Sequence, residues 1–237
     1  MSISHLTFID IETVNAEETP SELFQKRFRK EMDEAYLVAS DASPTYRRIE
    51  AVKSVFESKA ALHAEFGKVV AISIGKWVDD EKKFYIRTLS GINEIELLTQ
   101  STKSIERAGG THLVAHNGID FDFPFLMRRY IINGLPMPSQ LRAYGVKPWD
   151  LKLEDTMKMW GGSAWNYKVS LELLCHVLGL ESPKKDIEGS DVAELFYKGD
   201  EESLKKIADY CAGDVLACAN AYCRMKGLPV IENVEYV

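Results

Sequence analysis

A chain of 237 residues, 46% hydrophobic and 27% charged, has the composition of a globular protein, which excludes a fibrous or disordered one. Its formal charge of −7 argues against a broad nonspecific nucleic-acid-binding surface, although bound cations can reverse the field of an acidic site. With no apolar run of the ~18 residues that span a membrane, no signal-peptide pattern and no CxxC pair among the four cysteines, we expect a cytoplasmic protein without a membrane partner.

The hydrophobic pattern predicts alternating strands and helices, beginning with a strand at residues 6–12. A charged, mostly helical stretch follows at 17–64, and then a β-hairpin formed by 69–78 and 84–89. The remaining predicted elements are helix 93–108, a strand within 111–118, a helix within 123–134, a segment at 151–160 that suits a strand end or a helix start, and helices at 170–180, 191–199 and 202–227. This order predicts an α/β layered fold with a mixed sheet.

Two carboxylates interrupt the most strand-like segment, FIDIET. Asp10 and Glu12 are two residues apart, so they lie on the same face of a strand. If that face is covered, two like charges are costly unless a cation lies between them. Hard cations such as Mg²⁺ and Mn²⁺ prefer oxygen ligands. A solvated strand end is the alternative, and a lone pair of acids favours it.

Two later segments also carry acids, and each is ordinary when taken alone. HNGIDFDFPFL supplies Asp120 and Asp122 between a strand and a helix, where a loop with a helix cap would look the same. YCAGD supplies Tyr210 and Asp214 one helical turn apart, which also suits a simple hydrogen bond on a helix surface.

Taken together and in this order, the three segments resemble the motifs of the DEDD superfamily of 3′–5′ exonucleases. The resemblance is closest to the proofreading exonuclease domain of family B DNA polymerases and its stand-alone relatives, and it covers residues 5 to about 225. It implies a ribonuclease H-like α/β fold with a mixed five-stranded sheet flanked by helices. The whole chain, 1–237, is then a single exonuclease domain with a helical insertion at about 17–64.

The same resemblance implies a two-metal-ion mechanism with two divalent cations, Mg²⁺ or Mn²⁺. The second segment resembles N-x-x-x-F-D-x-P-[YF]-[LI], which selects Asp122 rather than Asp120, and the third resembles Y-x-x-x-D, the tyrosine subclass. The roles it implies are Asp10 bridging both cations, Glu12 and Asp214 completing one site, Asp122 serving the other, and Tyr210 orienting the attacking water. The implied substrate-binding residues are Asn117, Phe121 and Lys158.

The expected partner is nucleic acid, with single-stranded DNA preferred and RNA possible, and a protein partner remains unidentified. Residues 123–185 carry nine Lys or Arg and five acids, and their aromatic residues Trp149, Trp160, Trp165 and Tyr167 suit base stacking. A scattered solvated surface and ordinary packing are the alternatives. Asp155 and Lys158, in EDTMKMW, resemble a polar segment near the polymerase exonuclease site.

Three other functions compete with this prediction. An exoribonuclease on the same fold differs only in its substrate. A glycosidase would use Asp10 and Glu12 as its carboxylate pair, but that leaves Asp122, Tyr210 and Asp214 without a role and requires no metal. A noncatalytic nucleic-acid-binding module would be expected to lack a metal carboxylate, and none of the four is missing.

Overall fold

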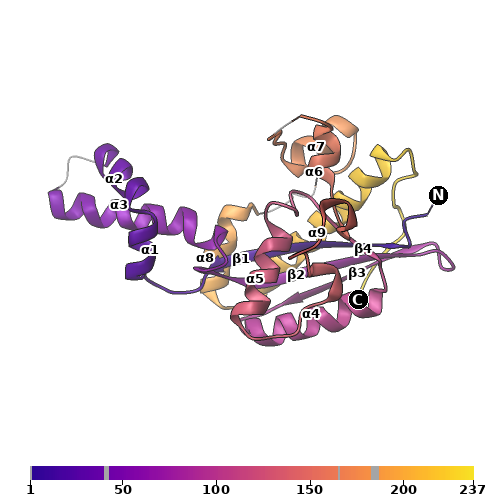
Figure 1. The fold of residues 1–237 in the computed structure, drawn as a ribbon, viewed down its shortest axis with the longest axis horizontal. Coiled ribbons are helices and arrows are strands. Elements are labelled where there is room, and N and C mark those ends of the chain that lie inside the picture. The colour runs from indigo at the N-terminus through magenta and orange to yellow at the C-terminus, as the bar shows by residue number, and fades with distance from the viewer. Residues whose placement is uncertain (1, 40–42, 165, 183–186) are drawn as a thin grey trace. The chain divides into compact units, whose positions relative to one another are not determined.

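The computed structural model describes residues 2–39, 43–164, 166–182 and 187–237 (Figure 1). The chain forms two compact units, of which the smaller is Thr13–Lys68 and the larger contains the residues on either side of it. In the described residues, no helix is both long enough and apolar enough to cross a bilayer. All four cysteines are free thiols with buried side chains.

The larger unit is organised around a mixed sheet of six strands in the order β5-β4-β1-β2-β3-β6. Their bounds are β1 Leu6–Asn15, β2 Gly67–Val78, β3 Lys83–Ser90, β4 His112–Ala115, β5 Leu153–Asp155 and β6 Val234–Tyr236. β2 and β3 form the predicted antiparallel hairpin, whereas β4 runs parallel to both β1 and β5. The α/β fold with a mixed sheet is therefore confirmed.

The sheet has one strand more than predicted, namely β6, which pairs with β3 in parallel. This strand has only three residues, too few for an alternating apolar pattern to be recognised in the sequence. Backbone hydrogen bonds fix it instead: the Phe84 amide donates to the Asn233 carbonyl at 2.9 Å, and the Val237 amide donates to the Ile86 carbonyl at 2.9 Å.

Helices flank this sheet, and Figure 1 shows its strands passing between α4 and the pair α6 and α7. The helices of this unit are α4 Glu94–Ala108, α5 Asp122–Ile132, α6 Thr156–Gly161, α7 Leu171–Leu178, α8 Val192–Lys198 and α9 Glu201–Met225, with short 3-10 turns at Ser139–Leu141, Pro148–Asp150 and Gly189–Asp191. The segment at 151–160, which suited a strand end or a helix start, is both: β5 ends at Asp155 and α6 begins at the next residue.

The long helix α9 packs directly on the sheet. Its Val215 belongs to the same buried cluster as Phe8 of β1 and Phe84 of β3. A side chain at Gly75 of β2 would place its Cβ 2.5 Å from both Val215 and Phe84, so only glycine allows this close approach. The helix is capped at its start by Asp200, whose carboxylate accepts the Ser203 amide at 2.7 Å. The packing holds the middle of α9 against β1.

A buried ion pair connects α4, α5 and β2. The Arg129 guanidinium of α5 donates from Nε to the Glu94 carboxylate of α4 at 2.9 Å, and a second hydrogen bond joins the same two groups. The Glu94 carboxylate also accepts the Val69 amide at 2.8 Å. A buried pair of this kind fixes geometry more than it adds stability. It therefore holds in place the helix that begins at Asp122.

The smaller unit is helical, as predicted for residues 17–64. It contains α1 Glu22–Arg27, α2 Arg29–Val38, α3 Pro44–Lys59 and a 3-10 turn at Ala60–Leu62. Its own core is formed by Phe24, Phe28, Met32, Val55, Phe56 and Ala60. The ring of Phe24 packs against the rings of Phe28 and Phe56 and against that of Phe66 at the edge of this core. This segment therefore buries apolar surface within itself.

Candidate active site

The first two acids lie on β1, in the part of the strand that α9 covers. Glu12 is buried, and Asp10 is partly buried, but the Asp10 Oδ2 atom is shielded from solvent and has no hydrogen-bond partner. The thiol of Cys211, on α9, donates to the Asp10 backbone carbonyl at 3.4 Å. Because residues two apart share a face, Asp10 continues the face on which Phe8 packs into the core. The strand therefore directs a carboxylate into a covered region.

The third acid begins α5. Asp122 is only 3% exposed, and its carboxylate accepts hydrogen bonds from its own backbone amide and from that of Ile11 on β1. The fourth acid, Asp214, lies on α9 one turn after Tyr210 and raises the pKa of Asp10, Glu12 and Asp122 by its charge. Three separate elements thus bring four carboxylates within electrostatic range of one another.

The raised pKa values of the acids in this cluster favour a bound positive charge. Burial first, and then the charges of Asp214 and Asp122, raise the pKa of both Asp10 and Glu12 well above the usual range. Burial also raises the pKa of Asp122 to about 7. Each carboxylate would therefore bind a proton more readily than usual, or share a cation in its place. An all-oxygen carboxylate set with an unpartnered buried oxygen fits a divalent metal ion.

Asp120 and Asp122 differ sharply in their surroundings, although both follow β4. Asp120 lies at the surface, where its carboxylate accepts hydrogen bonds from Lys158 at 2.8 Å and from Lys168 at 3.0 Å. These two ammonium groups lower its pKa. Its charge is already compensated by two ammonium groups, whereas the hydrogen bonds to the Asp122 carboxylate come from backbone amides. This contrast favours Asp122 as the metal-ligating residue of the pair.

The three implied substrate-binding residues lie around this surface. Asn117 adopts a left-handed backbone with φ of 63°, and its side-chain oxygen accepts a hydrogen bond from Lys168 at 3.0 Å. Lys158 forms an ion pair with Asp120. The Phe121 ring packs against that of Phe125 on α5, with ring centroids 5.5 Å apart. Asn117 and Lys158 therefore belong to one polar surface network, while Phe121 also supports the start of α5.

Asp155 has a larger structural part than its sequence context indicated. It is 2% exposed, and its carboxylate accepts four backbone amides: those of Asn117 and Ile119 at 3.0 Å each, Met157 at 2.8 Å and Lys158 at 3.2 Å. Two of these amides belong to the loop that leads into Asp122, and two belong to the first turn of α6. Asp155 therefore fixes the loop that places a candidate metal ligand.

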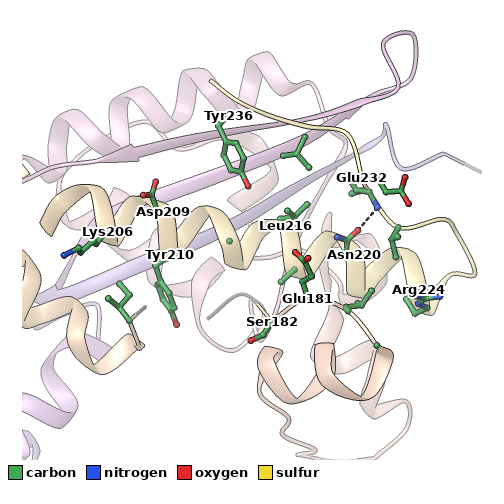
Figure 2. A pocket seen from close by; sticks show the side chains of 18 residues that line it. Glu181, Ser182, Lys206, Asp209, Tyr210, Leu216, Asn220, Arg224, Glu232 and Tyr236 are labelled. Atoms are coloured by element: carbon green, nitrogen blue, oxygen red, sulfur yellow. Dashed lines mark hydrogen bonds between the residues drawn. The ribbon is translucent and has the colours of Figure 1, made fainter. Parts of the chain in front are cut away.

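Tyr210 lies on the open side of α9, beside a groove of about 760 Å³ (Figure 2). The groove follows α9 past Leu216 and Asn220, and the Asn220 side chain accepts the Ile231 amide at 2.7 Å, the contact drawn in Figure 2. Burial and then the charge of Asp214 raise the pKa of the Tyr210 hydroxyl far above its usual value. The hydroxyl therefore remains protonated and is available for hydrogen bonding.

The fold of this chain has a counterpart in part of a larger solved protein. The structure resembles that of the family B DNA polymerase from the hyperthermophilic archaeon Pyrobaculum calidifontis, with a TM-score of 0.58 and 13% sequence identity over 92% of this chain. The match covers 24% of the polymerase, so this chain spans about a quarter of that protein. At this level of identity, the likeness establishes the fold alone.

Membership of a particular family follows from the sequence match. Residues 60–233 match the family described as predicted 3′–5′ exonucleases related to the exonuclease domain of PolB, and the chain belongs to that family. The resemblance drawn from the three acidic segments is therefore confirmed. An uncharacterised protein of Methanocaldococcus jannaschii, MJ0365, is 30% identical over 129 residues, which cover 52% of this chain and 69% of that protein.

Proposed function

We propose that this protein is a metal-dependent 3′–5′ exonuclease that removes nucleotides from the 3′ end of single-stranded DNA. The observation that carries the proposal is the convergence of Asp10, Glu12, Asp122 and Asp214, in which burial and the charge of Asp214 raise the pKa of the other three acids. A family of predicted 3′–5′ exonucleases supplies the reaction class. Carboxylates in such a site are stable in their charged form only with cations bound.

In this proposal, Asp10, Glu12, Asp122 and Asp214 would hold two divalent cations. When bound, such a pair stabilises the attacking and the leaving oxygen of an in-line displacement at phosphorus. Tyr210, on α9 one turn before Asp214, remains protonated and holds the attacking water by a hydrogen bond. The partly buried position of Asp10, with one shielded oxygen, limits the access of bulk water. The protein therefore contributes mainly ligand placement and orientation of the nucleophile.

The preference for a single strand rests on exposed aromatic side chains in the stretch between Asp122 and Tyr210. Trp149 is 77% exposed, and the Lys147 ammonium lies 5.5 Å from the centre of its ring. Trp160 and Tyr167 are also exposed, whereas Trp165 lies outside the described residues. Unpaired bases stack on such rings, and a duplex end must first lose a base pair at a cost of a few kcal/mol.

A single oligonucleotide labelled at its 5′ end tests the polarity and the preferred strand form. It is digested with Mg²⁺ as a single strand and as a blunt duplex, beside an RNA strand of the same sequence. We expect a ladder that shortens stepwise, fastest for single-stranded DNA. Faster digestion of the RNA would assign an exoribonuclease instead. Immediate release of the labelled 5′ nucleotide, or cuts within a circular strand, would contradict the proposed reaction.

A further inference from the structure

One side chain at the candidate site has no part in the proposed reaction, namely the thiol of Cys211. This residue is fully buried on α9, one position after Tyr210 and three before Asp214. Its sulfur and one carboxylate oxygen each from Asp10 and Glu12 all lie within 4.8 Å of one another. In the part of the chain that the structure describes, these three side chains form the one group of Cys, His or acidic donors with this spacing.

This thiol is unsuited to the hard cations of the proposed nuclease reaction. Mg²⁺ takes oxygen ligands and binds sulfur poorly. With Mg²⁺ in the site, Cys211 is therefore a neighbour of the ligands rather than one of them.

We propose that the site also takes a thiophilic divalent cation of the Zn²⁺ or Cd²⁺ class, with the Cys211 sulfur as a ligand beside Asp10 and Glu12. If the protein is the proposed nuclease, this second mode of binding holds it in an inactive form. The binding itself does not depend on that function. The second observation is the Oδ2 atom of Asp10, which is shielded from solvent and has no hydrogen-bond partner. This oxygen can therefore bind a cation beside the thiol.

The chemistry of the donor set supports this assignment. Zn²⁺ binds thiolate at about 2.3 Å and carboxylate oxygen at about 2.0–2.2 Å, commonly in a tetrahedral arrangement. On binding, the S–H bond of Cys211 breaks, the metal–sulfur bond forms and the proton passes to solvent, with no oxidation or reduction. Zn²⁺ also exceeds Mn²⁺ in affinity for most protein donor sets. A thiophilic cation would therefore displace the catalytic cations and bind the Cys211 sulfur in addition to the carboxylate oxygens.

The test is a titration of the metal-free protein with Cd²⁺, followed by the ultraviolet charge-transfer band that forms only when thiolate binds the metal. The wild type is expected to develop this band with one equivalent of Cd²⁺. Cys211→Ser should lose the band and bind Cd²⁺ at least about tenfold more weakly, since even partners outside the first ligand shell contribute that much. Cys223→Ser, which removes another buried thiol of α9, serves as the matched control and should keep the band.

A second measurement needs no variant and covers the case in which Cys211→Ser does not fold. X-ray absorption at the zinc edge of the wild-type protein, loaded with one equivalent of Zn²⁺, should contain one sulfur neighbour. An oxygen-only shell, or an undiminished Cd²⁺ band in folded Cys211→Ser, would overturn the proposal. Neither readout uses nuclease activity, so a sulfur-ligated metal in a protein without Mg²⁺-dependent digestion would reject the proposed function and leave the metal assignment intact.

Discussion

Removing the charge of Asp122 should stabilise the metal-free protein, although it removes a candidate metal ligand. Asp122→Asn keeps the size and shape of the side chain and abolishes its titration. In the folded protein, burial raises the pKa of this carboxyl from its ordinary value of 3.8 to about 7. The charged form is therefore disfavoured by folding, and an uncharged amide at the same position escapes that cost.

The magnitude and the direction follow from proton linkage. Each pKa unit corresponds to about 1.4 kcal/mol, so a change from 3.8 to about 7 corresponds to about 4 kcal/mol. Because the folded-state pKa is raised, stability is fully present below the unfolded pKa and is lost as the pH rises through the folded pKa. The free-energy cost of ionising Asp122 in the folded protein is less than half as large at pH 5 as at pH 8. The Ile11 amide prefers a carboxylate oxygen, so we expect a net gain of roughly 2–4 kcal/mol at pH 8.

Thermal unfolding in EDTA at pH 5 and pH 8 measures this effect. A gain of that size should raise the Tm at pH 8 by roughly 4–16 °C for a chain of this length, and by less at pH 5. The matched control is Asp120→Asn, which loses two surface ion pairs with Lys158 and Lys168 and should be unchanged or slightly less stable. An Asp122→Asn protein that is no more stable than the wild type at pH 8, or whose gain is equal at both pH values, would refute the electrostatic argument.

The other predictions concern single changes at the same site. Asp10→Ala should lower Mg²⁺-dependent digestion by at least about 10³-fold in a folded protein, because it removes the ligand shared by both cations; turnover near normal would contradict this. Tyr210→Phe should lower the turnover rate by roughly 10²-fold with little change in strand affinity, and a rate within twofold of the wild type would indicate a packing role. Asp155→Asn should weaken Mg²⁺ binding by about tenfold in calorimetry, through the loop before Asp122, and an unchanged affinity would limit Asp155 to capping α6.

The sequence predicted most of the larger unit because its elements carry strong periodic patterns. The hairpin of β2 and β3 and the helices α4 and α9 have long alternating or amphipathic repeats bounded by caps, which depend on local residues alone. The short strands β5 and β6 could not be defined in this way, since three residues do not establish a period. Their positions depend on pairing with β4 and β3, which are distant in sequence.

The acidic cluster was accessible from the sequence only through the order of three motifs, since each motif alone suits an ordinary loop or helix. What the sequence could not indicate is how each acid is compensated. Asp120 and Asp122 are two residues apart, yet the first is paired with surface lysines, and the second is buried and accepts its hydrogen bonds from backbone amides. The four-amide contact of Asp155 was equally inaccessible, because two of its donors come from a loop nearly forty residues earlier.

The most direct test of a two-metal 3′–5′ exonuclease compares the wild type, Asp122→Asn and Asp120→Asn on a 5′-labelled single-stranded DNA. The three proteins are purified in the same way and assayed with Mg²⁺ and with EDTA. The assignment predicts a stepwise ladder for the wild type and for Asp120→Asn with Mg²⁺, and intact DNA for Asp122→Asn and for every EDTA reaction. Digestion by Asp122→Asn at the wild-type rate, or digestion that persists in EDTA, would contradict it.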